Sequence, residues 1–359
     1  MRSLKLNLIP GDGIGVDVIK EGRKILGHIA ELDGNIKFIF NELPWSCEYY
    51  LKHGYMMPAD GLKILEDCDA ILLGAVGFPS VPDHISLREL LLPIRCSFDQ
   101  YVNLRPVKLL PGLKSTLKKE KIDFVVVREN SEGEYCGRGR FESEGTENER
   151  AIQEAVFTKH GTERIIQYAF EYALKNKLKS LISATKSNAL NYSMVFWDRI
   201  FNEQKAEYPG IQSRSVHVDA LAGLFIMKPE EIEVVVASNL FGDILTDLGS
   251  AMLGSIGLSP SANINPERHY PSMFEPIHGS APDIAGKGIA NPIGTIWAIV
   301  MMLEHLELKD PALLLMNAMT AVLADGKIRT PDIGGKSSTS EVVDEIICKM
   351  MKQDNRYNK

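Results

Sequence analysis

The sequence predicts an α/β protein with a largely parallel sheet, organised in two lobes. Short β-branched runs alternate with stretches of helical period along the whole chain, which is the pattern of a parallel sheet covered by helices. The 359 residues exceed the roughly 250–300 at which a single core usually stops growing. A content of 45% hydrophobic and 24% charged residues is ordinary for a globular enzyme and excludes a disordered chain.

The strands are expected in short apolar runs bounded by Gly, Asn, Asp or Lys. These runs are Lys5–Pro10, Ile36–Phe40, Ala70–Leu73, Phe124–Val127, Leu181–Ala184 and Glu233–Ala237. The clearest helix between them is Thr162–Lys175, because its apolar residues recur on one face. Thr162 is a suitable N-cap for this helix, and Glu163 suits its first turn.

Net charge, hydrophobic runs and cysteine usage exclude several classes of partner and location. The formal net charge of −7 argues against nucleic acid or an anionic membrane as the main partner. The strongly apolar uncharged run from Gly288 to Leu303 contains Pro292 and is shorter than the roughly 20 residues of a membrane-spanning helix. The N-terminus lacks the apolar stretch of a leader, and the five cysteines form no CxxC pair. We therefore expect a cytoplasmic protein without disulfides or a cysteine metal site.

The segment Gly137–Arg150 (GRGRFESEGTENER) differs from the rest of the chain, because it is dense in charge and glycine and has few apolar side chains. Two interpretations stay open. The segment is either a solvated surface loop or a projecting arm that becomes ordered against a partner subunit.

The segment GDGIG (Gly11–Gly15) follows a predicted strand and opens a helix, as a dinucleotide-binding turn does. The dinucleotide fingerprint requires GxGxxG and an acid at a strand end about 20 residues further on. Here the third glycine comes one position early, and the next acid after a strand, Glu42, lies too far along the chain. A tight turn beside a site is the favoured interpretation.

The segment Asn239–Asp247 (NLFGDILTD) carries the strongest chemical signal. It follows the predicted strand Glu233–Ala237, and open α/β sheets bind ligands at the carboxyl ends of their strands. Asp243 and Asp247 are four residues apart and share a helix face, where a hard cation such as Mg²⁺ or Mn²⁺ would offset their repulsion. Two solvated acids are the alternative. Asp219, at the end of another extended run, is a candidate third oxygen ligand.

Three arginines at element boundaries, Arg95, Arg105 and Arg128, are candidates for carboxylate binding, because the planar guanidinium can hold a carboxylate through two hydrogen bonds. If they converge, they would hold a small di-acid; taken singly, each fits a surface salt bridge. Tyr135 and Lys186 are candidate proton carriers. A lysine becomes a useful base only where burial or nearby cations lower its pKa.

The segment that runs from Glu275 to Pro292 (EPIHGSAPDIAGKGIANP) is rich in glycine and proline. It is either a turn-rich loop without ligand or a nucleotide-binding loop lined by backbone. In the second case Asp283 could accept hydrogen bonds from ribose hydroxyls and repel a 2′-phosphate.

Taken together, these segments resemble the isocitrate/isopropylmalate family of β-decarboxylating dehydrogenases. The matching pieces follow in family order: GDGIG at residue 11, GAVG at 74, NLRP at 103, RENSEGEY at 128, TKSNAL at 185, HVDA at 217, NLFGDILTD at 239 and EPIHGSAPDIAGKGIANP at 275. Within the family the chain is most similar to the tartrate/D-malate dehydrogenases, through VPDHISL (Val81–Leu87) and FDQYVNLRPV (Phe98–Val107).

The resemblance implies a two-domain, isopropylmalate-dehydrogenase-like fold that is not a standard Rossmann fold. A larger domain would comprise residues 1–100 and 255–359 and carry the nucleotide loop. A smaller domain would comprise residues 101–254, with the dimer interface and the arm. The resemblance further implies a homodimer with shared active sites, a small hydroxy di-acid as substrate, and no nucleic-acid or membrane partner.

The resemblance also implies roles for the candidate site residues. Arg95, Arg105 and Arg128 would bind the substrate carboxylates. Lys186 of a second subunit would take the 2-hydroxyl proton while hydride passes to NAD. The 2-keto acid would then lose its β-carboxylate as CO₂, and Tyr135 would protonate the remaining carbon.

The implied cofactors are NAD and Mg²⁺ or Mn²⁺. Asp243 and Asp247 would bind the metal, joined by Asp219 of the second subunit. The nucleotide would be bound by Ile14, Gly74, His278, Gly279, Ser280, Ala281, Asp283 and Asn291. An acid at position 283 favours NAD over NADP.

Position 88 departs from the tartrate/D-malate pattern, which carries Trp where this chain has Arg88. Arg88 either binds an extra substrate carboxylate, as an isocitrate or homoisocitrate site would require, or points to water. Leu91 and Leu92 resemble the apolar wall that receives an isopropyl group. We expect oxidative decarboxylation of a malate-type 2-hydroxy acid, with D-malate or tartrate favoured. The alternatives are 3-isopropylmalate as substrate and a non-catalytic metabolite-binding subunit.

Overall fold

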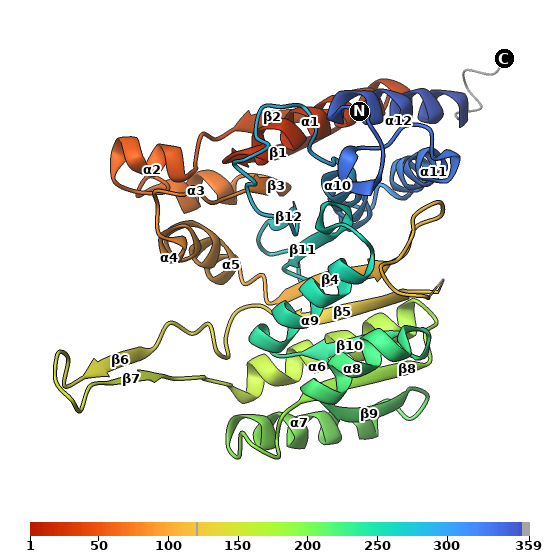
Figure 1. Cartoon of the computed structure of the whole chain (residues 1–359). Coiled ribbons are helices and arrows are strands. Elements are labelled where there is room, and N and C mark those ends of the chain that lie inside the picture. The colour runs from red at the N-terminus through yellow and green to blue at the C-terminus, as the bar shows by residue number, and fades with distance from the viewer. Residues whose placement is uncertain (120, 354–359) are drawn as a thin grey trace. The chain divides into compact units, whose positions relative to one another are not determined.

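The computed structural model describes residues 1–119 and 121–353, and the chain divides into two compact units. Unit 1 comprises Met1–Gln100, the segment that begins at Lys108, and the chain from Ser250 onward. Unit 2 comprises Tyr101–Val107 and Lys121–Gly249. Each unit contains strands flanked by helices (Figure 1), so the predicted α/β class with a mostly parallel sheet is confirmed.

Unit 1 contains five strands in the spatial order β2-β1-β3-β12-β11. All the strand pairs are parallel except β11 with β12. The strands are β1 (Arg2–Gly11), β2 (Ile36–Glu42), β3 (Ala70–Ala75), β11 (Pro260–Ile264) and β12 (Ser272–Pro276).

The helices of unit 1 cover these strands. Helices α1 and α10 pack directly on the strands, and α11 and α12 pack on α1 and α10. Every residue of α10 from Ile293 to Leu303 is buried, which explains the long uncharged run as a core helix. The helices are α1 (Ile14–Asp33), α2 (Cys47–His53), α3 (Gly61–Glu66), α4 (Asp83–Ser86), α5 (Leu92–Ser97), α10 (Ile293–His305), α11 (Lys309–Asp325) and α12 (Thr339–Gln353), with the short turns η1 (Leu87–Leu91), η3 (Ile256–Leu258) and η4 (Pro331–Ile333).

Unit 2 has its own strands in the order β4-β5-β10-β8-β9, and β5, β10, β8 and β9 pair in parallel. Its central strand β10 is fully buried, as expected where helices cover both faces of a parallel sheet. The elements are β4 (Val102–Lys108), β5 (Asp123–Glu129), β8 (Ser180–Thr185), β9 (Gln212–His217), β10 (Val234–Ala237), α6 (Lys159–Lys175), α7 (Ser193–Glu207), α8 (Val218–Met227), η2 (Pro229–Glu231) and α9 (Asn239–Met252).

The predicted strands all coincide with observed ones, since each apolar run lies in, or extends by one residue beyond, β1, β2, β3, β5, β8 or β10. The predicted start of the helix at Thr162 is wrong. Helix α6 begins at Lys159, and its N-cap is Thr158, whose Oγ1 accepts a hydrogen bond of 3.0 Å from the Gly161 amide. Thr162 is fully buried within the helix, and Glu163 therefore lies beyond the first turn.

The GDGIG segment forms a tight turn between β1 and α1. Gly13 has a φ of 57°, and a Cβ there would lie 2.0 Å from the Ser280 carbonyl oxygen. The same oxygen accepts a hydrogen bond of 2.8 Å from the Ile14 amide. Asp12 accepts hydrogen bonds from the amides of Cys47 and Gly77. The glycines therefore serve close backbone packing, in agreement with the favoured interpretation.

The segment Gly137–Arg150 forms most of an antiparallel hairpin, β6 (Gly139–Glu142) with β7 (Arg150–Gln153), which extends from unit 2 (Figure 1). Phe141 is 65% exposed on it. A two-stranded hairpin on its own is only marginally stable in water, which favours the arm over the solvated loop.

Within residues 1–119 and 121–353, none of the helices combines the length and apolar character that a membrane span needs. All five cysteines are free thiols.

Candidate active site

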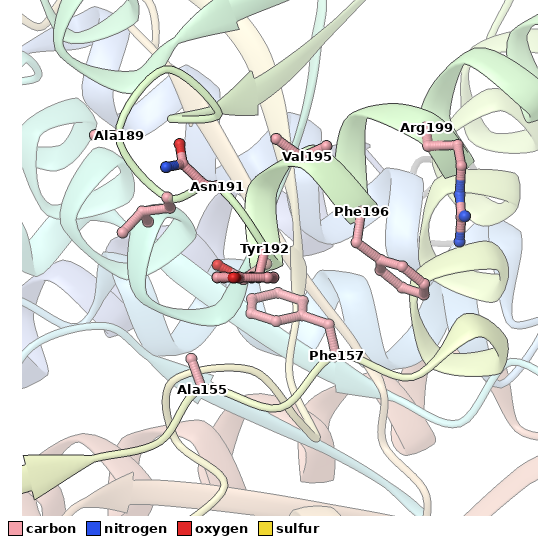
Figure 2. A pocket seen from close by; sticks show the side chains of 10 residues that line it. Ala155, Phe157, Ala189, Asn191, Tyr192, Val195, Phe196 and Arg199 are labelled. Carbon is pink, nitrogen blue, oxygen red and sulfur yellow. The ribbon is translucent and has the colours of Figure 1, made fainter.

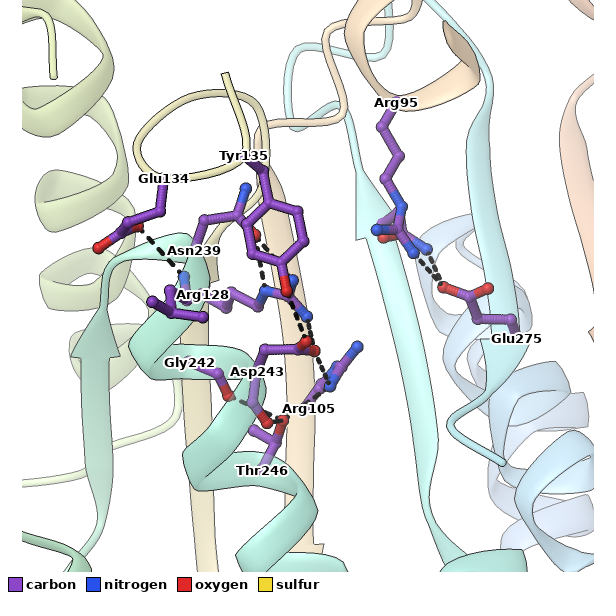
Figure 3. Close-up of polar contacts among 12 residues, drawn as sticks. Arg95, Arg105, Arg128, Glu134, Tyr135, Asn239, Gly242, Asp243, Thr246 and Glu275 are labelled. Carbon is purple, nitrogen blue, oxygen red and sulfur yellow. Dashed lines mark hydrogen bonds and ion pairs between the residues drawn. The ribbon is translucent and has the colours of Figure 1, made fainter. Parts of the chain in front are cut away.

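Helix α9 organises a polar site in unit 2. Strand β10 is buried along its whole length, and its carboxyl end passes directly into the first turn of α9. The helix therefore presents Asn239, Asp243 and Thr246 on one face at helical spacing, toward Arg105 of β4 and Arg128 of β5 (Figure 3).

Asp243 lies at the centre of this site (Figure 3). Its Oδ1 accepts hydrogen bonds from Nη1 of Arg105, at 3.2 Å, and from Nη1 of Arg128. Its Oδ2 accepts a hydrogen bond of 3.0 Å from the Tyr135 hydroxyl. The arginine side chains are 7% and 2% exposed, whereas Asp243 is 34% exposed. Four residues that were singled out from the sequence therefore meet here. The carboxylate of the candidate metal ligand is the counter-ion of the two arginines that are candidates for binding substrate.

Neighbouring side chains on α9 orient both arginines. Asn239 Oδ1 accepts hydrogen bonds from Arg128 Nε at 3.1 Å and Nη2 at 2.7 Å, and Thr246 Oγ1 accepts one of 2.7 Å from Arg105 Nη1. Gly242 allows the close approach, because a Cβ there would lie 2.6 Å from Cγ of Arg128. The sequence analysis missed Asn239 and Thr246. Their spacing of four and three residues from Asp243 is the signal that could have found them.

Asp243 and Asp247 have the chemistry of a divalent-cation site. Partial desolvation raises the pKa of Asp247, and the adjacent Asp243 carboxylate raises it further, against the opposing effect of Arg105 and Arg128. Carboxylate oxygens are what Mg²⁺ and Mn²⁺ prefer, so this donor pair fits such an ion. In the part of the chain that the structure describes, no group of three or more His, Cys, Asp or Glu side chains could hold a metal. Asp219 of the same chain therefore does not complete the set.

Lys186 and Asp219 form a separate pair at the carboxyl ends of β8 and β9. Lys186 Nζ donates a hydrogen bond of 2.7 Å to Asp219 Oδ1, and the ammonium holds the pKa of Asp219 below its ordinary value. The side chains are 27% and 67% exposed, so both are accessible to a partner.

In unit 1, Arg95 on α5 is held by Glu275 at the end of β12. Arg95 Nη2 donates to Glu275 Oε1 at 3.1 Å (Figure 3). Asn263 Nδ2 donates to the same oxygen at 2.7 Å. The ion pair is about nine-tenths buried. Arg95 Nε is buried, and no hydrogen-bond partner for it lies among the described residues. Glu275 was not predicted as its partner.

The loop that follows β12 has features of a ligand-binding loop. His278 is 6% exposed, and its Nε2 is buried with no hydrogen-bond partner among the residues described. Burial lowers the pKa of His278, which favours a neutral imidazole. A Cβ at Gly279 or Gly286 would meet no atom within 4 Å, so the backbone there is open. Asp283 is exposed on the same loop. An unsatisfied imidazole beside open backbone fits a polar ligand such as a dinucleotide.

The other residues that were predicted to bind the nucleotide lie in or beside this loop. Ile14 and Ser280 are buried and joined by the hydrogen bond of the GDGIG turn, and Gly74 is buried in β3. Ala281 has a φ of 38°. Asn291 lies two residues before the start of α10, and its Oδ1 accepts a hydrogen bond of 3.0 Å from the Ile293 amide.

Arg88 lies in η1, a π-helical turn between α4 and α5, and is exposed. In this turn the Leu92 amide donates to the Leu87 carbonyl, five residues back. Pro93, which has no amide hydrogen to continue the α-helical pattern, follows directly. Leu91 and Leu92 are half-buried. Such single π-turns are frequent at functional sites.

An open pocket of about 820 Å³ lies elsewhere in unit 2, beside α7 (Figure 2). Its lining is mainly apolar and includes Phe157, Leu190, Tyr192, Val195 and Phe196. None of the predicted site residues lines it, and Tyr192 is 92% exposed.

Comparisons with known proteins confirm the family resemblance. A model of the family described as "Isocitrate/isopropylmalate dehydrogenase" matches residues 5–346. The chain is 51% identical over 354 residues to the "Probable tartrate dehydrogenase/decarboxylase" of Bacillus subtilis (strain 168), covering 98% of this chain and 99% of that protein. It is 51% identical over 361 residues to the "D-malate dehydrogenase [decarboxylating]" of Escherichia coli (strain K12), with coverages of 98% and 99%. The structure superimposes on isocitrate dehydrogenase from Methylococcus capsulatus with a TM-score of 0.87 at 33% identity, covering 97% and 99% of the two chains.

Proposed function

Because this chain belongs to the isocitrate/isopropylmalate dehydrogenase family, we propose that it catalyses the NAD- and divalent-metal-dependent oxidative decarboxylation of a malate-type 2-hydroxy acid, with D-malate or tartrate as substrate. The observation that carries the proposal is the cluster of Arg105, Arg128 and Tyr135 around Asp243. It combines carboxylate binding, a metal ligand and a proton donor in one place.

The arginines are proposed to bind the substrate carboxylates. Arg105 and Arg128 are buried and share the Asp243 carboxylate in this chain. A di-acid substrate would offer each arginine a further carboxylate to bind. Arg95 is proposed to contribute a further carboxylate contact, because Glu275 holds one end of its guanidinium while Nε has no partner among the described residues.

Asp243 and Asp247 would hold Mg²⁺ or Mn²⁺ together with Asp219 of the partner subunit. When bound, the cation would stabilise negative charge on the substrate oxygen, and NAD would accept the hydride. His278, the open backbone at Gly279 and the exposed Asp283 support the proposed nucleotide loop. The carboxylate of Asp283 would repel a 2′-phosphate, which supports NAD as the cofactor.

Two residues are proposed to move protons. The Nζ of Lys186 of the partner subunit takes the proton of the substrate's 2-hydroxyl group as the C–H bond gives up its hydride. The β-carboxylate then leaves as CO₂, and the Tyr135 hydroxyl donates a proton to the carbon that carried it. The hydrogen bond of Tyr135 to Asp243 supports this proposal.

A second copy of this chain is proposed to complete the site. Helix α8 is almost wholly apolar, yet only Leu221 and Phe225 are buried on it. Met227 on α8 and Ile244 on α9 are 70% and 59% exposed, and an apolar surface of this kind is typical of an interface. The accessible Lys186–Asp219 pair supplies the two groups that the α9 site lacks. A cytoplasmic location stays a prediction.

The test is initial-rate NADH formation from D-malate, the tartrates, 3-isopropylmalate, isocitrate and homoisocitrate, with Mn²⁺ and then with EDTA. We expect turnover of D-malate or a tartrate that EDTA abolishes. A kcat/KM for 3-isopropylmalate tenfold above that for D-malate, about 1.4 kcal/mol, would reassign the substrate. A preference for a tricarboxylate would make Arg88 a substrate ligand. No metal-dependent turnover of any compound would indicate the non-catalytic subunit.

A further inference from the structure

The loop that carries Tyr135 is attached by hydrogen bonds to three consecutive residues at the start of α9. The Glu132 carbonyl accepts a hydrogen bond of 3.3 Å from Asn239 Nδ2. Glu134 Oε1 accepts one of 3.0 Å from the Ser238 hydroxyl, and Glu134 Oε2 accepts one of 3.3 Å from the Leu240 amide. The Tyr135 hydroxyl then reaches Asp243 one turn further along the helix.

Glu134 acts as the cap of α9 in place of the residue that normally does so. The first amides of a helix lack partners within the helix, and a carboxylate there is favoured by both hydrogen bonding and the helix dipole. A serine preceding a helix usually accepts from one of these amides. Here Ser238, which is fully buried, instead donates its hydroxyl to Glu134, and Glu134 accepts from the Leu240 amide.

We propose that Glu134 is the positioning residue for Tyr135, an inference that rests on the proposed proton-donor role of that tyrosine. Glu134 is adjacent to Tyr135 in the chain and is held at two atoms of the helix start. Its two hydrogen bonds therefore fix the loop at the height on α9 where the Tyr135 hydroxyl meets Asp243. Glu134 does not contact Asp243 itself; it acts on the reaction through the tyrosine.

Asn239 performs the corresponding task for substrate binding. Its Oδ1 accepts hydrogen bonds from Nε and Nη2 of Arg128, while its Nδ2 donates to the tyrosine loop. We therefore expect the loss of Glu134 and the loss of Asn239 to have different kinetic effects. Loss of Glu134 should act mainly on kcat through Tyr135, whereas loss of Asn239 should act mainly on KM through Arg128.

The experiment is a double-mutant cycle between Glu134→Gln and Tyr135→Phe, with kcat and KM measured for the preferred hydroxy acid. Phenylalanine keeps the ring that lies 5.5 Å from the Arg128 guanidinium and removes only the hydroxyl. We expect Glu134→Gln to lower kcat about tenfold, the effect of one lost charge-assisted hydrogen bond, and to change KM less. The double variant should be no slower than Tyr135→Phe, because the position of an absent hydroxyl has no effect.

The control is Glu341→Gln. Glu341 accepts hydrogen bonds from the amide and hydroxyl of Ser338 at the start of α12 in unit 1, outside the catalytic machinery. It removes a comparable capping carboxylate and should leave kcat unchanged. Asn239→Ala is the second variant, expected to raise KM more than it lowers kcat.

The outcomes separate this inference from the proposed function. If Tyr135→Phe slows turnover and the effect of Glu134→Gln multiplies with it, Glu134 is only structural and the inference is wrong. An unchanged kcat in Glu134→Gln overturns it equally. If Tyr135→Phe itself leaves kcat unchanged, the proton-donor role falls, and the positioning role falls with it.

Discussion

Replacing Asp243 with asparagine removes the counter-charge that Arg105 and Arg128 share. Leaving one member of a buried ion pair uncompensated costs about 3–5 kcal/mol. Asp243 is 34% exposed, and solvent screening reduces that cost. Asn239 and Thr246 also continue to accept hydrogen bonds from the two guanidinium groups. We therefore expect the free energy of unfolding to fall by about 1–2 kcal/mol.

The assay is urea-induced unfolding at neutral pH, without and with Mn²⁺. The matched control is Asp325→Asn, which breaks the more exposed Lys349–Asp325 pair and should lower the free energy of unfolding less than Asp243→Asn does. Mn²⁺ should stabilise the wild type and the control by mass action but not Asp243→Asn, which lacks a metal ligand. The reasoning is refuted if Asp243→Asn is as stable as the wild type, or if Mn²⁺ stabilises it equally.

Three other changes follow from single contacts. Gly161→Ala should destabilise the protein by about 1 kcal/mol in thermal or urea unfolding, because its Cβ would lie 1.9 Å from Glu132 Oε1 and would displace that carboxylate from its hydrogen bonds with Thr158. Gly27→Ala, in open space on α1, should instead stabilise it by about 0.4–1 kcal/mol, and equal effects would contradict the clash. Because burial lowers the pKa of His278, the unfolded state binds the proton more tightly. The free energy of unfolding should therefore fall as the pH drops below about 6.5, less steeply in His278→Gln; identical slopes would dismiss this contribution. Asp283→Lys should raise the ratio of NADP to NAD kcat/KM about tenfold or more, and an unchanged ratio would assign cofactor choice to another residue.

The strands were predictable because their apolar runs are buried, and burial is what the pattern of side chains records. The start of α6 was not, because its cap depends on contacts that periodicity does not contain. Thr158 accepts from Gly161, and Glu132, distant in sequence, accepts from the Thr158 amide. The hairpin β6–β7 was left between two interpretations, since its charged sequence has no apolar alternation.

The site, too, was predictable in part: several of its residues were, and their mutual contacts were not. Spacing alone paired Asp243 with Asp247, element boundaries singled out the arginines, and the resemblance assigned roles to the arginines and Tyr135. Neither indicated that Asp243 would be the shared partner of Arg105 and Arg128. The Arg95–Glu275 contact joins residues 180 positions apart, a separation at which no local pattern is informative. Lys186 was expected to act from a second subunit, and in the single chain its ammonium pairs with Asp219.

The central claim is that oxidation and decarboxylation occur together at one metal-dependent site. The most direct measurement is the yield of CO₂ per NADH formed from D-malate and NAD by the purified protein, with Mn²⁺ and after EDTA. We expect one CO₂ for each NADH, and we expect the formation of both products to stop on chelation. NADH without CO₂, or turnover that survives EDTA, would contradict it.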